Sequence, residues 1–116
     1  MTRWAKIHDR IAESNGFAET ANENREAALL FLLMFPQCDV YGVIQAGFRL
    51  FTAKVCPLLE ITEEALTQAF DCMERHGLIE QYRSEDQMPY ICLPNFLKYQ
   101  ECRWERVGPP EHPLPP

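Results

Sequence analysis

Residues 61–80 read ITEEALTQAFDCMERHGLIE, and this stretch decides the fold. Thr62 is a favoured helix N-cap, and the two acids that follow it suit the positive end of a helix dipole. Apolar residues then recur at helical spacing in one stripe, formed by Leu66, Ala69, Phe70 and Met73. The pattern predicts a helix that runs to His76 and ends at Gly77, a residue that suits the position after a helix C-terminus.

Two strands are expected after this helix. Leu78–Arg83 and Tyr90–Leu93 are separated by the polar residues 84–87, a pattern typical of a β-hairpin. A short strand is also expected at Val43–Ile44, just after a turn that ends at Gly42. We expect this short strand to pair with the hairpin and to close a three-stranded sheet.

Two more helices are expected in the first half of the chain. One covers about residues 23–35, takes its N-cap from Asn22–Asn24 and stops at Pro36. Its second half is apolar on every side, so it needs cover all round, either from the N-terminal segment or from a second subunit. The other covers Phe48–Cys56 and stops at Pro57.

The order helix, short strand, helix, helix, strand, strand is that of a winged helix. We therefore predict an α+β fold that is mostly helical: a winged helix-turn-helix with a short three-stranded sheet and an N-terminal helical arm. The arm covers residues 1–22 and is interrupted by Ser14-Asn15-Gly16. The winged-helix domain covers residues 23–106 and ends in a short helix at Asn95–Trp104, and residues 107–116 form a proline-rich tail or a truncated linker.

The composition is that of one ordinary globular domain. The chain has 116 residues, of which 47% are apolar and 24% charged. Its formal net charge of −6 excludes a generally basic nucleic-acid coat. The longest apolar stretch, Ala27–Phe35, has nine residues and is too short for a transmembrane span. The N-terminus lacks an apolar signal region, so we expect a cytoplasmic domain that does not enter a membrane.

The cysteines and histidines indicate neither a metal centre nor catalysis. The five cysteines, Cys38, Cys56, Cys72, Cys92 and Cys102, include no C-x-x-C pair, and we expect them to be reduced and partly packed in the core. The sequence has no nucleophile–histidine–acid pattern and no phosphate-binding loop. His76 is expected to act as a cation at the negative end of its helix. We therefore expect no cofactor, no metal and no enzymatic activity.

Four stretches carry a family resemblance: Trp4 leading to Ile7-His8-Asp9, Cys38-Asp39-Val40-Tyr41-Gly42, Met73-Glu74-Arg75-His76-Gly77-Leu78-Ile79, and Tyr90-Ile91-Cys92-Leu93-Pro94-Asn95-Phe96-Leu97-Lys98-Tyr99-Gln100. Through them the chain resembles the N-terminal winged-helix domain of phage and prophage replisome-organising proteins related to DnaD. The resemblance implies a domain that helps to organise the replication machinery at an origin. It also implies self-association and partner binding as well as DNA contact.

The outward face of the third helix argues against ordinary reading of the major groove. Its exposed positions are Glu63, Glu64, Thr67, Gln68, Asp71 and Glu74; four of the six are acidic, and phosphates repel carboxylates. Any DNA contact therefore depends on local sites, for which the candidates are Arg49, Lys54, Gln68, Arg75, Arg83, Lys98, Arg103, Trp104 and Arg106. Residues 103–106 interleave arginines with an aromatic, which suits base stacking, but these arginines can instead pair with Glu101 and Glu105.

We therefore expect a winged-helix module of a phage-type replication initiation protein. It would act through replication proteins or a second copy, with weak or auxiliary DNA contact. The candidate association surface is Leu29, Leu32, Leu33 and Phe35, together with the N-terminal arm. The alternative is a sequence-specific transcriptional regulator with DNA contacts from the hairpin and the C-terminal cations. A third hypothesis is an adaptor whose proline-rich tail docks on another protein.

Overall fold

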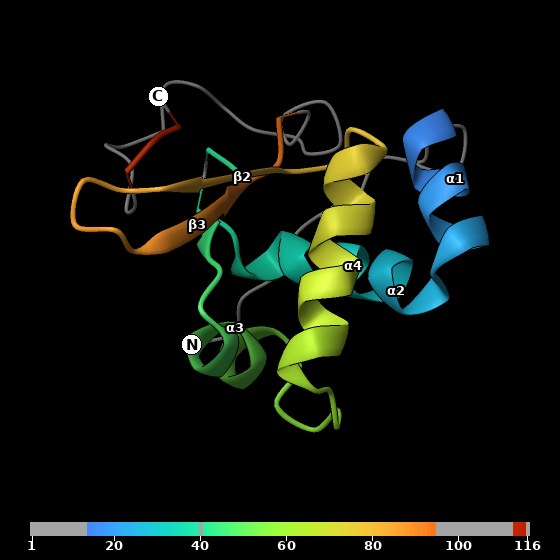
Figure 1. The fold of residues 1–116 in the computed structure, drawn as a ribbon, viewed down its shortest axis with the longest axis horizontal. Coiled ribbons are helices and arrows are strands. Elements are labelled where there is room, and N and C mark those ends of the chain that lie inside the picture. Colours follow the sequence, from blue (N-terminus) through green and yellow to red (C-terminus); the bar gives the residue numbers. More distant parts are fainter. Residues whose placement is uncertain (1–13, 40, 95–112, 116) are drawn as a thin grey trace.

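A computed structural model describes residues 14–39, 41–94 and 113–115 (Figure 1). Its elements in chain order are α1 (Asn15–Glu23), α2 (Arg25–Met34), the 3-10 turn η2 (Phe35–Gln37), β1 (Val43–Gln45), α3 (Phe48–Val55), α4 (Glu63–Arg75), β2 (Glu80–Arg83) and β3 (Pro89–Cys92). The α+β architecture, with a helix-turn-helix and a small three-stranded sheet, confirms the winged-helix prediction. The helix predicted at residues 95–104 lies outside the described residues.

Helix α4 begins and ends as its sequence predicts. The Thr62 hydroxyl accepts a hydrogen bond from the Ala65 N–H at 3.1 Å and so caps the first turn. At the other end Gly77 has a φ of +80°, a conformation that a side chain would disfavour. The chain reverses there, and the Leu78 N–H donates to the Met73 carbonyl at 2.9 Å, which closes the helix end.

The junction between the first two helices lies at Asn24. Helix α1 starts at the Ser14-Asn15-Gly16 stretch, since the Ser14 hydroxyl accepts from the Phe17 N–H at 3.2 Å; the part of the predicted arm before Ser14 lies outside the described residues. Helix α1 then runs to Glu23, across the expected boundary between the arm and the domain. Asn24 ends α1 and caps α2, accepting from the Ala27 N–H at 3.1 Å. The N-cap predicted within residues 22–24 is therefore confirmed at Asn24, and the second helix begins at Arg25, two residues later than expected.

The remaining element ends differ from prediction by one or two residues. Helix α2 ends at Met34, one residue before the predicted end, and Pro36 lies in the 3-10 turn η2 that follows. Helix α3 ends at Val55, with Cys56 as its C-cap. Strand β2 begins at Glu80 because Leu78 and Ile79 form the buried link from α4.

The three strands form an antiparallel sheet in the order β1-β3-β2. Val43 pairs with Cys92 on one side of β3, and Tyr82 pairs with Tyr90 on the other. The prediction that the short strand closes the sheet is confirmed. Beyond β2, the Tyr82 hydroxyl donates to the Pro113 carbonyl at 2.5 Å, so this part of the predicted tail lies against the hairpin.

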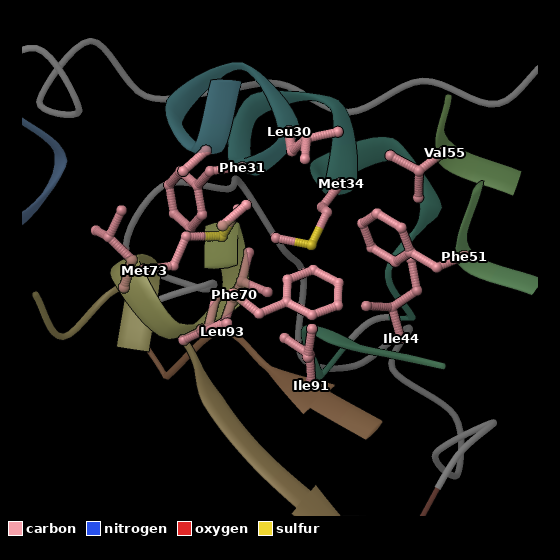
Figure 2. Packing of buried hydrophobic residues seen from close by; sticks show 14 of the residues in the cluster. Leu30, Phe31, Met34, Ile44, Phe51, Val55, Phe70, Met73, Ile91 and Leu93 are labelled. Atoms are coloured by element: carbon pink, nitrogen blue, oxygen red, sulfur yellow. The ribbon is translucent and has the colours of Figure 1, made fainter. Parts of the chain in front are cut away.

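The core fills the space between the helices and one face of the sheet, as Figure 2 shows. Phe51 of α3 and Phe70 of α4 meet edge to face with ring centroids 4.9 Å apart, an arrangement that the ring quadrupoles favour. Met34 and Ile91 close the cluster from α2 and β3 (Figure 2). The described cysteines, Cys38, Cys56, Cys72 and Cys92, are all buried thiols, while Cys102 lies outside the described residues.

Helix α1 packs against both α2 and α4 and lies beside the C-terminal half of α4 (Figure 1). Its Phe17 ring lies 6.1 Å from that of Phe31, so α1 supplies part of the cover that the apolar second helix needs. Gly16 makes the close approach to α4 possible, because a Cβ there would lie 2.5 Å from the His76 carbonyl oxygen. This glycine fixes how near the two helices come.

Candidate functional site

The outward face of α4 is exposed and acidic. Six exposed residues form it: Glu63, Glu64, Thr67, Gln68, Asp71 and Glu74. Within the described residues, twelve acids stand against five cations, Arg25, Arg49, Lys54, Arg75 and Arg83. The helix that would enter the major groove in a DNA-reading winged helix therefore presents mostly carboxylates.

The candidate cations do not gather on this face. Arg75 donates to both carboxylate oxygens of Glu23, at 2.6 and 2.5 Å, and is held against α1. Arg83 is exposed on the hairpin, where its guanidinium donates to the Gln87 carbonyl at 2.8 Å. Arg49 and Lys54 are exposed on α3. The C-terminal candidates Lys98, Arg103, Trp104 and Arg106 lie outside the described residues.

A groove of about 420 Å³ runs between the N-terminal half of α4 and the hairpin. Aromatic residues line much of it, and the Tyr82 and Tyr90 rings stack with centroids 5.9 Å apart. Glu63 and Arg83 are its charged lining residues, one from each wall. The groove therefore offers aromatic side chains together with one charge of each sign.

Three exposed leucines lie on α3 and in the turn that follows it. Leu58 is 94% exposed, and Leu50 and Leu59 are also exposed. Leu59 lines a hollow of about 380 Å³ in which Glu60 and Ile61 also take part. We call Leu50, Leu58 and Leu59 the leucine surface. The first acids of α4 follow it directly in the sequence.

The predicted association surface on α2 is only partly a surface. Leu29 is 47% exposed, whereas Leu32 and Leu33 are half-buried and Leu33 packs against the core. Phe35 is 1% exposed and meets Phe31 edge to face at 5.2 Å, so its place in an association surface is wrong. The sequence shows an apolar helix but not which sides α1 and the core cover.

Five polar side chains meet where α1 crosses the end of α4. His76 approaches Glu19 through Nδ1 and Glu23 through Nε2, both at 3.1 Å. The buried Cys72 thiol hydrogen-bonds to Glu23, and Arg75 bonds the same carboxylate. These contacts lower the pKa of Glu23 to about 2, with the thiol and then the guanidinium as the main causes. Burial and the nearby Glu23 raise the pKa of Cys72 to about 11.

Sequence reasoning treats these residues singly and misses the cluster. Glu19 and Glu23 are four residues apart on α1, and Cys72 and His76 are four apart on α4. That spacing places each pair on one helix face. The signal in the sequence is the spacing itself, but only the packing of α1 on α4 brings the two pairs together.

Comparisons with protein-family models, curated proteins and solved structures find no match for this chain. Among the described residues, no helix has the length and apolar character needed to cross a membrane.

Proposed function

We propose that this chain is a winged-helix module of a phage-type replication initiation or replisome-organising protein. It acts by binding a protein partner, and its contact with DNA is auxiliary. The observation that carries this proposal is the exposed acidic face of α4, combined with the engagement of Arg75 by Glu23. The resemblance of the sequence to replisome-organising proteins supplies the biological setting.

The electrostatics oppose groove binding by α4. A DNA duplex carries one charge per roughly 1.7 Å of its axis, so each carboxylate on a groove-bound helix meets several phosphates. Arg75 lies on α4 but donates to Glu23, and turning it towards DNA would uncover that carboxylate. Binding of α4 in the groove would therefore add repulsion and remove an existing ion pair.

The leucine surface supports a protein partner. A side chain as exposed as Leu58 gains free energy when a partner covers it, about 1.5–3 kcal/mol for a fully buried leucine. Glu60, Glu63 and Glu64 flank this surface in the sequence. The matching partner surface carries apolar side chains next to lysines or arginines. Because the described part of this chain is itself acidic, charge complementarity favours a different protein over a second copy.

The test measures binding of the full chain to purified replication proteins, namely the origin-binding initiator, the replicative helicase and its loader. We expect one of them to bind, and Leu58→Asp or Glu63→Lys to weaken that binding by about tenfold or more. Met88→Asp, at an exposed apolar residue of the hairpin, is the matched control and should leave binding unchanged. Absence of binding to all three proteins would contradict the proposal.

The hairpin supplies one observation for the alternative, a DNA-binding transcriptional regulator. Arg83 is exposed and its guanidinium is oriented by the Gln87 carbonyl, as a wing contact to phosphate would require. Fluorescence anisotropy with labelled duplex and single-stranded DNA separates the two functions. Duplex binding tighter than about 10 μM at physiological salt, with a salt slope reduced by about one in Arg83→Ala, would favour the regulator.

A further inference from the structure

The junction of α1 and α4 gathers three different metal-binding side chains. Glu23 lies at the end of α1, and Cys72 and His76 lie one turn apart on α4. A carboxylate oxygen, the thiol sulfur and a ring nitrogen of these residues all lie within 4.8 Å of one another. Borderline-soft divalent ions such as zinc are bound by this combination of sulfur, nitrogen and oxygen ligands.

The hydrogen bonds around His76 orient its ring for such a role. Nδ1 faces Glu19 Oε2 and Nε2 faces Glu23 Oε1, each at 3.1 Å. Histidines that bind metals through one nitrogen usually donate the other N–H to a carboxylate, which fixes the ring and raises its basicity. Glu19 occupies that outer position, and Nε2 faces Glu23, the carboxylate that the Cys72 thiol also contacts.

We propose that this junction binds a zinc-class divalent ion through Cys72 Sγ, His76 Nε2 and a carboxylate oxygen of Glu23, with Glu19 holding the histidine ring. The three ligands leave one tetrahedral position open to water. Binding displaces the thiol proton of Cys72 and any proton on His76 Nε2, and both are released to solvent.

The distances suit this ion after small side-chain movements. Bonds of about 2.0–2.1 Å to nitrogen and oxygen and about 2.3 Å to sulfur place tetrahedral ligand atoms roughly 3.3–3.6 Å apart. Nε2 and Glu23 Oε1 are 3.1 Å apart, and the widest of the three separations is within 4.8 Å. The Glu23 side chain is 42% exposed, so it has room to rotate towards the ion. The ion then links α1 to α4 through coordination bonds, which replace the hydrogen bonds that link the two helices in its absence.

Arg75 competes with the ion, because its guanidinium holds both oxygens of Glu23. The arginine side chain is 57% exposed and has room in solvent when one carboxylate oxygen turns to the metal. Removing the guanidinium should therefore strengthen metal binding. A purely structural ion-pair cluster would show no such gain, so Arg75 distinguishes the two roles.

The test is a titration of the reduced full chain with cobalt(II) chloride. We expect one equivalent to bind with a sulfur-to-cobalt charge-transfer band, which is the signature of a thiolate ligand. The band should disappear in Cys72→Ala and His76→Gln and persist in Cys56→Ala, a control at another buried thiol. Glu19→Gln should raise the dissociation constant by about tenfold or more, and Arg75→Gln should lower it.

A second measurement covers the case in which Cys72→Ala fails to fold, since that thiol is buried. Zinc should raise the melting temperature of the wild-type chain and leave that of His76→Gln unchanged, because His76 is not deeply buried. A wild-type chain without the charge-transfer band would overturn the proposal. A band that persists in His76→Gln would do so as well, because the thiolate would then bind elsewhere.

Discussion

The two ends of α4 are stabilised in different ways. At the first end, Thr62 caps the helix and Glu63 and Glu64 face the positive dipole, so neighbouring residues in the sequence satisfy the exposed N–H groups. At the last end, Arg75 and His76 suit the negative dipole, but they are held by carboxylates of α1 more than 50 residues away in the sequence. One helix end is therefore completed locally and the other by tertiary structure.

The largest expected loss of stability comes from disturbing the C-terminal end of α4, which contacts with α1 complete. Gly16→Ala places a Cβ 2.5 Å from the His76 carbonyl oxygen, so α1 must move away from α4. We expect a loss of about 2 kcal/mol in the free energy of unfolding, measured by urea denaturation. Asn22→Ala, an exposed position on the same helix, should change it by less than about 0.7 kcal/mol. Equal losses in both variants would show that α1 does not depend on this close approach.

The next largest loss of stability comes from removing the cap at the N-terminal end of α4. Thr62→Ala removes the hydroxyl that accepts the Ala65 N–H, and we expect a loss of about 1 kcal/mol in the same measurement. Thr67→Ala serves as the control, because the Thr67 hydroxyl bonds back to the Glu63 carbonyl inside the helix. Alanine favours the helix interior, so this control should be neutral or slightly stabilising. A control as damaging as Thr62→Ala would contradict the capping role.

The pH dependence of folding stability also distinguishes the two ends of α4. The pKa of Glu23 is lowered from 4.5 to about 2 in the folded chain, chiefly by the Cys72 thiol and then by Arg75. Its stabilising effect is therefore complete above pH 4.5 and is lost as the pH falls towards 2. In metal-free buffer, Glu23→Gln should flatten the fall in stability across this range. Glu64→Gln, at the other end of α4, should keep the wild-type slope.

The smallest effect concerns Arg75. Its ion pair with Glu23 is exposed on both sides, 57% and 42%, so solvent screens much of the attraction. Arg75→Gln should lower the free energy of unfolding by less than Thr62→Ala does. The difference from the wild type should shrink further in about 1 M salt, where the screening length is about 3 Å. A loss that is insensitive to salt would mean that Arg75 acts through packing of its aliphatic stem.

The same contrast explains what the sequence predicts of the fold. The cap at Thr62, the turn at Gly77 and the hairpin are local patterns, and the structure confirms them. The N-cap expected within residues 22–24 is also a local pattern, and the structure places it at Asn24. The helix expected to stop at Pro36 ends one residue early, at Met34, because Pro36 lies in a 3-10 turn, which tolerates a proline near its start.

The candidate site is predicted less well, since its parts are distant in the sequence. The acidic outward face of α4 follows from helical periodicity alone, and the structure confirms that it is exposed. Phe35 is misassigned to a surface because periodicity cannot show which neighbour covers an apolar helix. The cluster around His76 depends on the close approach of α1 to α4 that Gly16 permits. Residue spacing within the sequence cannot predict this approach.

The distance in sequence between α1 and α4 also bears on the order in which the molecule assembles. The hairpin and the α1–α2 pair join neighbouring segments, whereas α1 reaches the end of α4 only after a loop of some fifty residues has closed. Long loops close late because the entropy cost comes before the contacts form. We expect the contact between α1 and α4 to form last in folding and to open first in native-state hydrogen exchange.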